Sequence, residues 1–315
     1  MLRSLAVKPS SAEAAVASAN LADLKNPYPA ELIADSFCAD LLDYLRRDIL
    51  FCGLMRQYDP RIIDHAALLT DEHGIRHFGL DITVDSPMDN RTRSSSTVHE
   101  YIHLLNIRFT LSQRVYFYGT KLAADALLGK AFRIMLYEGS TIGGKTPKDF
   151  LYDTSDELFV EALCNHPNSD VQYLGKRLRT RDLPRCVDEM DGIGLSRTKL
   201  GLIYNTFRGT INLGDWRDIE REIASKAGVR PADILIYSQK PEMSLKGANA
   251  LIQDEEGVVR NLTLYDEVPQ AATLEEEHKA LWRLYVFCGE TDIETCHKVR
   301  AISRDVLSDF LSQAS

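Results

Sequence analysis

A stripe of polar side chains on one predicted helix carries the strongest chemical signal in this sequence. Over residues 31–53 the apolar positions keep helical spacing, and Asp40, Tyr44 and Asp48 recur at every fourth position. Side chains four residues apart lie above one another on a helix, so two carboxylates and a phenol share one face. Such a face, when buried, needs partners, a metal ion or a ligand; when exposed, it is an ordinary solvated surface. Spacing alone leaves both interpretations open.

A second candidate site is the segment from His99 to His103, which matches the pattern H-E-x-x-H. Two histidines four residues apart on a helix can hold zinc, with Glu100 between them as the general base of a peptidase. No third ligand follows at a recognised zincin spacing, and the H-x-x-G-x-x-H extension is absent. A zinc peptidase that uses His99, Glu100 and His103 therefore ranks third among the function hypotheses below.

The segment 139–146 meets the phosphate-loop spacing G-x-x-x-x-G-K-[ST] literally, with Gly144, Lys145 and Thr146 at its end. A phosphate loop must follow a buried strand and open a helix. Here the segment follows a predicted helix, and Pro147 comes directly after it. We interpret it as a connection between two helices.

The elements that position these residues are predicted to be mainly α-helical. A long helix from about Thr97 to Glu138 carries the H-E-x-x-H segment, and a β-hairpin with its turn at Gly74 precedes it near residues 66–84. Periodicity and breakers divide the chain into an N-terminal extension or linker, a helical domain and a small α+β C-terminal lobe: 1–30, 31–228 and 229–315. Further helices are predicted in three pieces from residue 149 onward, the last at 183–190, and at 215–227, 273–286 and 292–311; strands are predicted at 234–237, 250–252 and 258–264.

Composition limits the classes of protein to which this chain can belong. Its 315 residues are 44% hydrophobic and 26% charged, with a formal net charge of −9, so nucleic acid is not expected as a partner. No apolar run approaches the roughly 20 residues that span a bilayer, so no membrane partner is expected either. The six cysteines contain no C-x-x-C pair, and the chain does not begin with a secretory signal. These features predict reduced thiols and a cytoplasmic location.

The order of residue types along the stripe also resembles a motif of a known family. The segment from Asp40 to Asp48 resembles the D-x-x-D-Y-x-x-R-D helix of HD-superfamily phosphohydrolases, and in particular of the deoxynucleoside triphosphate triphosphohydrolases. In that family the first Asp is the last ligand of an H…HD…D metal site, and the Tyr and final Asp line the nucleotide pocket. The resemblance therefore implies that Asp40 binds metal and that Tyr44 and Asp48 bind substrate. Leu41 stands where the family has a lysine, so one substrate contact is missing.

A second segment, 106–116, resembles the R-x-x-L-x-x-R-x-Y segment of the same family. The resemblance implies that Arg108 binds substrate phosphate and that Tyr116 lies against the nucleotide. Lys121 falls near the family's H-x-K element and is implied as a further substrate residue. These roles suit the two residue types, because guanidinium groups neutralise the charge that develops on a leaving polyphosphate, and a tyrosine can stack on a base. From the residues alone, Arg108 is equally a surface ion-pair partner and Tyr116 a core aromatic.

The resemblance also implies a fold and a metal requirement. The expected fold is an HD-domain-like helical bundle with a β-hairpin insertion and a small α+β lobe. No His-Asp pair occurs anywhere in the sequence, and only 39 residues precede Asp40. The chain is therefore expected to be a C-terminal portion that lacks the H…HD half. A divalent metal (Mn, Fe, Mg or Zn) is expected only if the missing ligands are supplied, no cofactor is expected otherwise, and the catalytic residues stay unknown.

Three functions follow from these observations. The first is an HD-superfamily phosphohydrolase-like protein that acts on or binds deoxynucleoside triphosphates and is inactive as this chain alone. The second is a non-catalytic nucleotide-binding protein or one that regulates a partner. The third is the zinc peptidase described above. The expected partners are a nucleoside triphosphate and further copies of the chain in a homo-oligomer.

Overall fold

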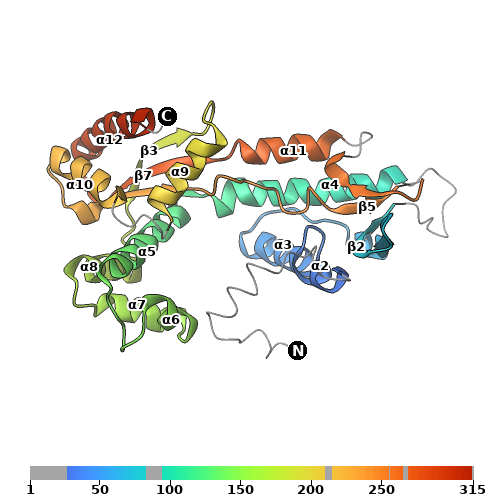
Figure 1. Cartoon of the computed structure of the whole chain (residues 1–315), viewed down its shortest axis with the longest axis horizontal. Coiled ribbons are helices and arrows are strands. Elements are labelled where there is room, and N and C mark those ends of the chain that lie inside the picture. Colours follow the sequence, from blue (N-terminus) through green and yellow to red (C-terminus); the bar gives the residue numbers. More distant parts are fainter. Residues whose placement is uncertain (1–26, 83–93, 210–214, 255, 265–268, 314–315) are drawn as a thin grey trace. The chain divides into compact units, whose positions relative to one another are not determined.

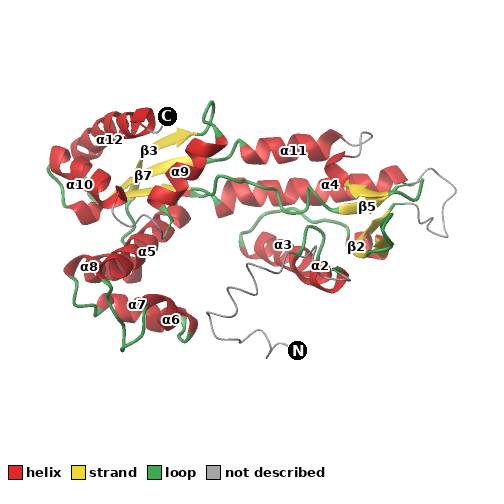
Figure 2. Cartoon of the chain, viewed as in Figure 1, coloured by secondary structure: helices red, strands yellow, loops and turns green. Residues whose placement is uncertain are grey.

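The described part of the chain folds into α-helices and two small β-sheets (Figure 1; Figure 2). This computed structural model describes residues 27–82, 94–209, 215–254, 256–264 and 269–313. They form two compact units, each built from two stretches of the chain. Unit 1 contains the described residues up to Tyr116 together with Ser244–Lys279, and unit 2 contains those of Phe117–Met243 and Ala280–Ser315. The predicted class, mainly α with some β structure, is confirmed.

Unit 1 combines helices with a four-stranded sheet in the order β1-β2-β5-β6. The β1 and β2 strands pair antiparallel and form the expected hairpin, in which Gly74 takes a positive φ of 75° at the turn. The β2 and β5 strands pair parallel, and β5 and β6 pair antiparallel. The elements are α2 (Tyr28–Ala34), α3 (Ala39–Phe51), η3 (Pro60–His65), β1 (Ala66–Thr70), β2 (Arg76–Asp81), α4 (Ser94–Leu111), η4 (Ser112–Tyr116), β5 (Leu251–Gln253), β6 (Val259–Asn261), η6 (Leu262–Leu264) and α11 (Pro269–Lys279).

The segment 31–53, predicted as one helix, is two helices, so that prediction is wrong. Helix α2 ends at Ala34, and α3 begins at Ala39 with Cys38 as its cap; the Cys38 Sγ accepts a hydrogen bond from Leu41 N at 3.3 Å. The break lets Phe37 turn into the core, where its ring stacks on Phe78 at 5.6 Å between centroids. Burial of an aromatic side chain outweighs the few backbone hydrogen bonds that a continuous helix would add.

The long helix predicted from 97 to 138 is also interrupted. Helix α4 ends at Leu111, η4 continues it as a π-helical turn, and Tyr118 has an extended backbone (φ −70°, ψ 134°) before α5 begins at Gly119. A π turn is wider than an α turn and often occurs at functional sites. The interruption places Arg108 and Tyr116 in unit 1 and Lys121 in unit 2.

The core of unit 1 lies where α3 packs against α4. Leu41, Leu45 and Ile49 of α3 and Leu104 and Leu105 of α4 are all at most 5% exposed. Burying each such side chain contributes roughly 1.5–3 kcal/mol. This packing fixes the rotation of α3 and therefore the direction of its polar stripe.

Unit 2 contains helices and the antiparallel sheet β3-β7-β4. The β4 strand and five of the six residues of β7 are fully buried, so this sheet forms the centre of a second core. None of the described helices in either unit has the length and apolar character needed to cross a membrane. The elements are α5 (Gly119–Glu138), α6 (Pro147–Tyr152), α7 (Asp156–Cys164), α8 (Ser169–Thr180), β3 (Arg185–Asp191), α9 (Arg197–Phe207), α10 (Asp215–Ala227), η5 (Pro231–Asp233), β4 (Ile234–Ser238), β7 (Arg283–Cys288) and α12 (Ile293–Gln313).

Two segments predicted as helices contain strands of this unit. Residues 185–190 of the helix predicted over 183–190 belong to β3, and the helix predicted over 273–286 is α11 of unit 1 followed by β7 of unit 2. Both segments pair with distant strands, an interaction that outweighs local helical preference. Asp188 is buried in β3, and its Oδ2 accepts a hydrogen bond from Arg304 Nε at 2.8 Å. Predicting this segment as a helix does not reveal that contact.

The two units do not follow the predicted boundary at residues 228–229. Residues 244–279 of the expected C-terminal lobe contribute β5, β6 and α11 to unit 1. Their apolar side chains, including Leu245, Ala248, Ile252 and Leu274, belong to the same core as α3 and α4. Two stretches that are far apart in the chain therefore build the surroundings of the polar stripe.

Candidate functional site

The polar stripe of α3 lies beside the buried face of that helix. Asp40 is exposed, with 57% of its side chain accessible, whereas Tyr44 and Asp48 are half-buried. The neighbouring Asp43 and Arg47 form an exposed ion pair of 2.7 Å, as expected for a solvated helix face. The two interpretations of the stripe thus apply to different parts of the helix: Asp43 and Arg47 are solvated, and Tyr44 and Asp48 face other elements.

Tyr116 of η4 and Asp48 of α3 form the tightest contact of this region. The Tyr116 hydroxyl donates a hydrogen bond to Asp48 Oδ2 at 2.6 Å. Burial, with the hydrogen bond to the carboxylate, raises the pKa of Tyr116 well above its usual range. The tyrosine therefore stays a protonated donor at neutral pH, and the π turn points it at α3.

Arg108 of α4 lies over the ring of Tyr44, with 5.4 Å between its Cζ and the ring centroid. Burial lowers the pKa of Arg108, and the nearby Tyr116, Cys38 and Asp40 partly oppose that shift. The Arg108 Nε and the Tyr44 hydroxyl are both buried atoms without a hydrogen-bond partner among the described residues. Unsatisfied buried polar atoms are uncommon in folded proteins and call for an explanation.

Lys246, which lies in the segment before β5, completes the polar surroundings of α3. Its Nζ is 3.2 Å from Asp40 Oδ2 and 5.7 Å from the centroid of the Tyr44 ring. Two cations, Lys246 and Arg108, thus lie within 6 Å of one tyrosine ring. We call the set Asp40, Tyr44, Asp48, Arg108, Tyr116 and Lys246 the α3–α4 cluster.

Ser112 and His278 lie next to the α3–α4 cluster and are both buried. The His278 Nε2 is 3.2 Å from Ser112 Oγ. Burial, and then the charge of Arg108, lowers the pKa of His278 to about 4, so this histidine is neutral at pH 7. None of these three residues was identified from the sequence: Ser112 is an unspecified position of the R-x-x-L-x-x-R-x-Y pattern, and His278 and Lys246 lie in no recognised motif and far from their contacts in the chain.

The described residues do not fit a metal ion at Asp40. Its ion-pair partner is the Lys246 ammonium, which cannot bind metal while it is protonated. Among the residues that the structure describes, no three His, Cys, Asp or Glu side chains are grouped so that they could hold a metal. Catalytic metal sites generally use about three protein ligands. The proposed role of Asp40 as a metal ligand therefore has no support from its neighbours in this part of the chain.

Comparison with known proteins places this site in a family context. Residues 96–309 match the family model described as the HD associated region. The chain belongs to the HD-associated region family. Its matched range contains Arg108, Tyr116 and Lys246 of the α3–α4 cluster but begins after α3.

A solved structure supports the assignment at the level of the fold. A phosphohydrolase from Bacteroides thetaiotaomicron VPI-5482 is similar to this chain with a TM-score of 0.52. The two sequences are 15% identical, and the match covers 92% of this chain and 70% of that one. At this identity the likeness concerns the fold alone. Among curated proteins, none matches the sequence.

The H-E-x-x-H segment of the HD-associated region connects parts of unit 1. The Glu100 Oε1 accepts a hydrogen bond from Asp59 N at 2.6 Å, and His103 Nε2 is 2.9 Å from Gln57 O. Both contacts hold the backbone that leads into η3. Glu100 and His103 therefore hold the backbone before η3 in place.

The segment that meets the phosphate-loop spacing connects two helices, as predicted. It follows α5, whose last residue is Glu138; the next residue, Gly139, has a left-handed φ of 62°. Lys145 forms an ion pair of 2.8 Å with Asp153, and the Thr146 side chain accepts from Asp149 N to cap α6. The lysine and the hydroxyl of this loop are therefore used within the protein.

Lys121, the remaining predicted substrate residue, lies in the first turn of α5 in unit 2. Its side chain is exposed and pairs with Asp125 at 2.6 Å. The α3–α4 cluster lies entirely within unit 1. The role of Lys121 as a substrate residue stays a prediction.

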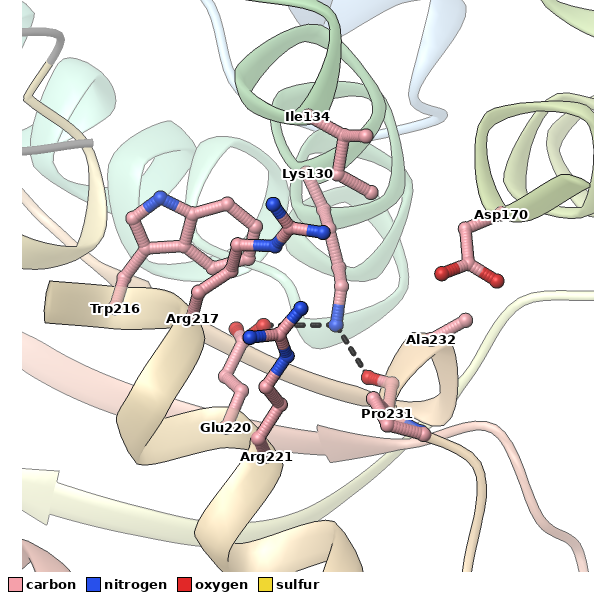
Figure 3. A pocket seen from close by; sticks show the side chains of 9 residues that line it. All are labelled: Lys130, Ile134, Asp170, Trp216, Arg217, Glu220, Arg221, Pro231 and Ala232. Atoms are coloured by element: carbon pink, nitrogen blue, oxygen red, sulfur yellow. Dashed lines mark hydrogen bonds and ion pairs between the residues drawn. The ribbon is translucent and has the colours of Figure 1, made fainter. Parts of the chain in front are cut away.

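Unit 2 contains a small pocket of about 110 Å³ beside Lys130 (Figure 3). Lys130 is 3% exposed, pairs with Glu220 at 2.7 Å and donates to Pro231 O at 2.6 Å. Burial lowers the pKa of Lys130, and the Glu220 carboxylate opposes that shift. Asp170 at the rim pairs with Arg230 at 2.7 Å. The central charges of this pocket are thus paired within the protein.

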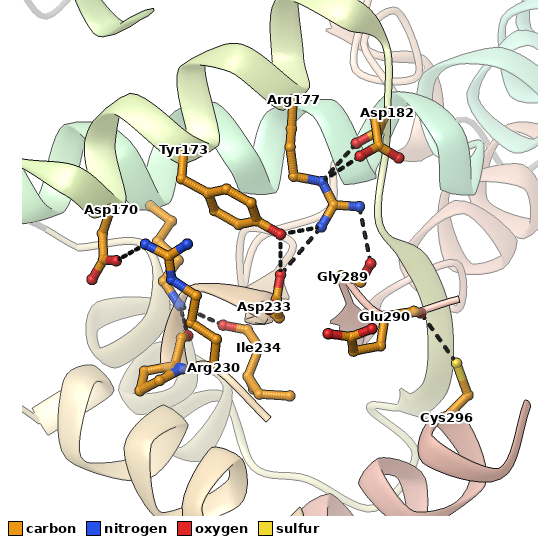
Figure 4. A network of polar contacts seen from close by, with 12 residues as sticks. Asp170, Tyr173, Arg177, Asp182, Arg230, Asp233, Ile234, Gly289, Glu290 and Cys296 are labelled. Carbon is orange, nitrogen blue, oxygen red and sulfur yellow. Dashed lines mark hydrogen bonds and ion pairs between the residues drawn. The ribbon is translucent and has the colours of Figure 1, made fainter. Parts of the chain in front are cut away.

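A second polar network of unit 2 surrounds the buried Arg177 of α8 (Figure 4). Its Nε donates to Asp182 O at 2.9 Å and its Nη2 to Gly289 O at 3.0 Å. Its Nη1 donates to Tyr173 Oη at 3.0 Å and Asp233 Oδ1 at 3.2 Å, and the Tyr173 hydroxyl donates to the same Asp233 oxygen at 2.6 Å. All three guanidinium nitrogens are therefore satisfied, and the network joins α8 to η5 and to the end of β7.

Proposed function

We propose that this chain is an HD-type phosphohydrolase-like protein whose α3–α4 cluster binds a phosphorylated nucleoside. One observation carries the proposal: Arg108 and Tyr44 are in contact, and each has a buried polar atom without a protein partner among the described residues. Leaving a buried donor unsatisfied costs about 1–3 kcal/mol, a cost that a ligand can remove. Family membership and the fold of the phosphohydrolase neighbour support the same conclusion.

The chemistry of the cluster suits a nucleotide. Arg108 provides a guanidinium for a phosphate, which it can bind with two parallel hydrogen bonds. Tyr44 and Tyr116 provide rings that can lie against a sugar or base. The Asp48 carboxylate accepts hydrogen bonds, and a ligand hydroxyl can compete for it with Tyr116. The resemblance of both segments to deoxynucleoside triphosphate triphosphohydrolases makes a deoxynucleoside triphosphate the proposed ligand, within an HD-like arrangement of helices.

Hydrolysis by this chain alone is expected to be very slow. HD-type chemistry, as implied by the resemblance, uses metal ligands from an H…HD pair, and the sequence contains no His-Asp dipeptide. The described residues offer Asp40, which is paired with Lys246. Electrostatic contacts from Arg108 without an activated water support binding and not turnover.

A binding titration with each deoxynucleoside triphosphate tests the proposal. Wild type should bind the triphosphate at least ten times more tightly than the matching deoxynucleoside. Arg108→Gln should reduce triphosphate affinity at least tenfold, because a charge-assisted contact of this kind contributes roughly 1.5–3 kcal/mol. Arg56→Gln is the matched control, since Arg56 is an exposed arginine of unit 1 that lies outside both motif segments. Equal affinities for the nucleoside and the triphosphate, or an unaffected Arg108→Gln variant, would contradict the proposal.

We also propose that the chain forms a homo-oligomer. Apolar side chains are exposed on α2, α3 and the segment after α3: Ile33 is 65% accessible, Phe51 84% and Met55 fully accessible. Grouped exposed apolar side chains are typical of interaction surfaces. Light scattering during size-exclusion chromatography should give a mass above the 35.5 kDa of one chain, and Phe51→Ser should reduce it. A monomeric wild type would overturn this part.

A further inference from the structure

Lys246 reaches the α3–α4 cluster from a segment that none of the recognised motifs covers. It is 28% exposed, and its Nζ contacts Asp40 Oδ2 at 3.2 Å. In the resembling family a lysine follows the ligand aspartate, and Leu41 occupies that position here. Leu41 is fully buried in the core. An ammonium group is therefore present next to Asp40 after all, although it comes from a residue more than two hundred positions later.

The backbone on both sides of Lys246 is fixed by buried contacts. Leu245 is fully buried, and its N–H donates to Glu275 Oε2 of α11 at 2.7 Å. The Gly247 carbonyl accepts from the Tyr101 hydroxyl of α4 at 2.8 Å. Burial raises the pKa of Tyr101 well above its usual range, so this donor stays protonated. Two hydrogen bonds, to different helices, thus fix the place from which the lysine side chain extends.

Gly247 allows this close approach to α4. Its φ of 103° lies in a region that residues with a side chain rarely adopt. A Cβ at this position would lie 2.9 Å from Leu105 Cδ2. Glycine is therefore required both by the backbone conformation and by the packing. A positioned loop of this kind is typical of a functional lysine more than of an incidental surface one.

The Lys246–Asp40 ion pair can be exchanged for a contact with a ligand. More than half of the Asp40 side chain is accessible, and ion pairs this exposed contribute little to stability. The ammonium also lies over Tyr44, 5.7 Å from the ring centroid, and the Arg108 guanidinium lies 5.4 Å from the same centroid. The two cations are thus no further apart than the sum of these distances. Successive phosphates of one polyphosphate can contact both.

We propose that Lys246 and Arg108 together bind the polyphosphate group of the ligand, and that this binding needs no metal ion. The inference rests on the proposed function and adds to it a residue and an electrostatic mechanism. Asp40 acts as the resting partner of Lys246: it holds the ammonium in the absence of ligand and releases it to a phosphate. The lack of fit between Asp40 and a metal has the same origin, because the carboxylate is already paired.

The test compares charge-changing variants with inorganic tripolyphosphate as the probe, in buffer with EDTA. Lys246→Met keeps an unbranched apolar stem and removes the charge, so it should weaken binding at least tenfold. Lys246→Arg should stay within about threefold of wild type. Lys240→Met, a change of an exposed lysine in unit 2, is the control and should bind like wild type. EDTA should leave the wild-type affinity unchanged.

Asp40→Asn separates the two roles of the carboxylate. If Asp40 is the resting partner of Lys246, its neutralisation frees the ammonium and should tighten tripolyphosphate binding by two- to fivefold. If Asp40 is a metal ligand, wild-type binding should require Mg²⁺ or Mn²⁺ and should be lost in Asp40→Asn, which would overturn the inference. A Lys246→Met variant that binds like wild type would overturn it too. In that case loss of binding in Arg108→Gln would still support the proposed function, whereas a wild type that binds neither tripolyphosphate nor nucleotide would overturn both.

Discussion

Arg108 of unit 1 and Arg177 of unit 2 both lie over tyrosine rings; Arg177 is buried, and Arg108 is half-buried with a buried Nε atom. Arg108 lies 5.4 Å from the centroid of Tyr44, and Arg177 lies 5.6 Å from that of Tyr173. In unit 2 the Tyr173 hydroxyl and all three nitrogens of Arg177 take part in hydrogen bonds with protein atoms. In unit 1 the Arg108 Nε and the Tyr44 hydroxyl have none among the described residues.

This difference separates a structural arginine from one that is available to a ligand. A fully satisfied buried guanidinium joins elements, and removing it leaves several groups without partners. An incompletely satisfied guanidinium contributes little to the fold and can gain hydrogen bonds when a ligand binds. The distance between the guanidinium and the ring is nearly the same at both sites. The hydrogen bonds of the arginine, and not the cation–π contact, therefore distinguish the two sites.

The largest expected effect on stability is at Arg177, the arginine with a structural role. Arg177→Met should lower the free energy of unfolding by about 3–5 kcal/mol, because it leaves Asp233 buried and without its charged partner. Urea denaturation followed by circular dichroism measures this change. Arg179→Met is the control: Arg179 is on the same helix with 54% of its side chain exposed, and the change should stay within about 0.5 kcal/mol. If Arg177→Met lowers the free energy of unfolding by less than about 1 kcal/mol, Arg177 does not have the structural role that separates it from Arg108.

The neighbour of Arg108 provides a pH-dependent effect. The pKa of His278 is about 4 in the folded protein, below the unfolded value of about 6.5. The unfolded state therefore binds more protons between these values, so stability should fall by at most about 3 kcal/mol from pH 6.5 to pH 4. His278→Gln should reduce this slope in urea titrations at several pH values. The charge of Arg108 also lowers the pKa of His278, so Arg108→Met should reduce the slope of stability against pH in part. An unchanged slope in both variants would contradict the assignment of this slope to His278.

A pair of glycine substitutions tests how tightly the Arg177 network is packed. A Cβ at Gly289 would collide with Asp233 and Arg177, so Gly289→Ala should destabilise by about 1–3 kcal/mol. Gly129 lies within α5, where an added methyl group would meet no neighbouring side chain within 4 Å, so Gly129→Ala should stabilise by about 0.5–1 kcal/mol. Thermal melting of both variants gives the two signs directly. No change or a stabilisation in Gly289→Ala would mean that the network has room to adjust.

The smallest effect on stability is expected at Arg108. Without ligand, Arg108→Met removes an unsatisfied buried donor, so the free energy of unfolding should change by less than about 1 kcal/mol in either direction. Saturating deoxynucleoside triphosphate should raise the melting temperature of wild type more than that of Arg108→Met. A loss of stability as large as that of Arg177→Met would make Arg108 a structural residue.

Sequence reasoning predicted those elements that local signals specify. The β-hairpin has a glycine at its turn, and helix α10 has helical periodicity and ends at Gly228, whose φ is 76°. It failed where distant residues decide the conformation. Strands β3 and β7 fall within predicted helices, because their pairing with each other across about a hundred residues leaves no local trace. The interruption at Phe37 depends on a core position that the aromatic ring fills.

The same distinction applies to the candidate site. Asp48 and Tyr116, which the family resemblance grouped, are hydrogen-bonded in the structure although 68 residues separate them. Lys246 could not be found in this way, because a single lysine in a loop has no periodicity and matches no motif. Its position depends on Leu245 and Gly247, whose contacts are visible only after folding.

The discontinuous composition of unit 1 has a consequence for the order of folding during synthesis. Its core needs Ser244–Lys279, which the ribosome makes only after the whole stretch Phe117–Met243 of unit 2. At roughly 5–20 residues per second, that delay is on the order of ten seconds. During this time the apolar faces of α3 and α4 lack the residues that later cover them. The cluster that Lys246 completes can therefore bind a ligand only after Phe117–Met243 of unit 2 has been synthesised.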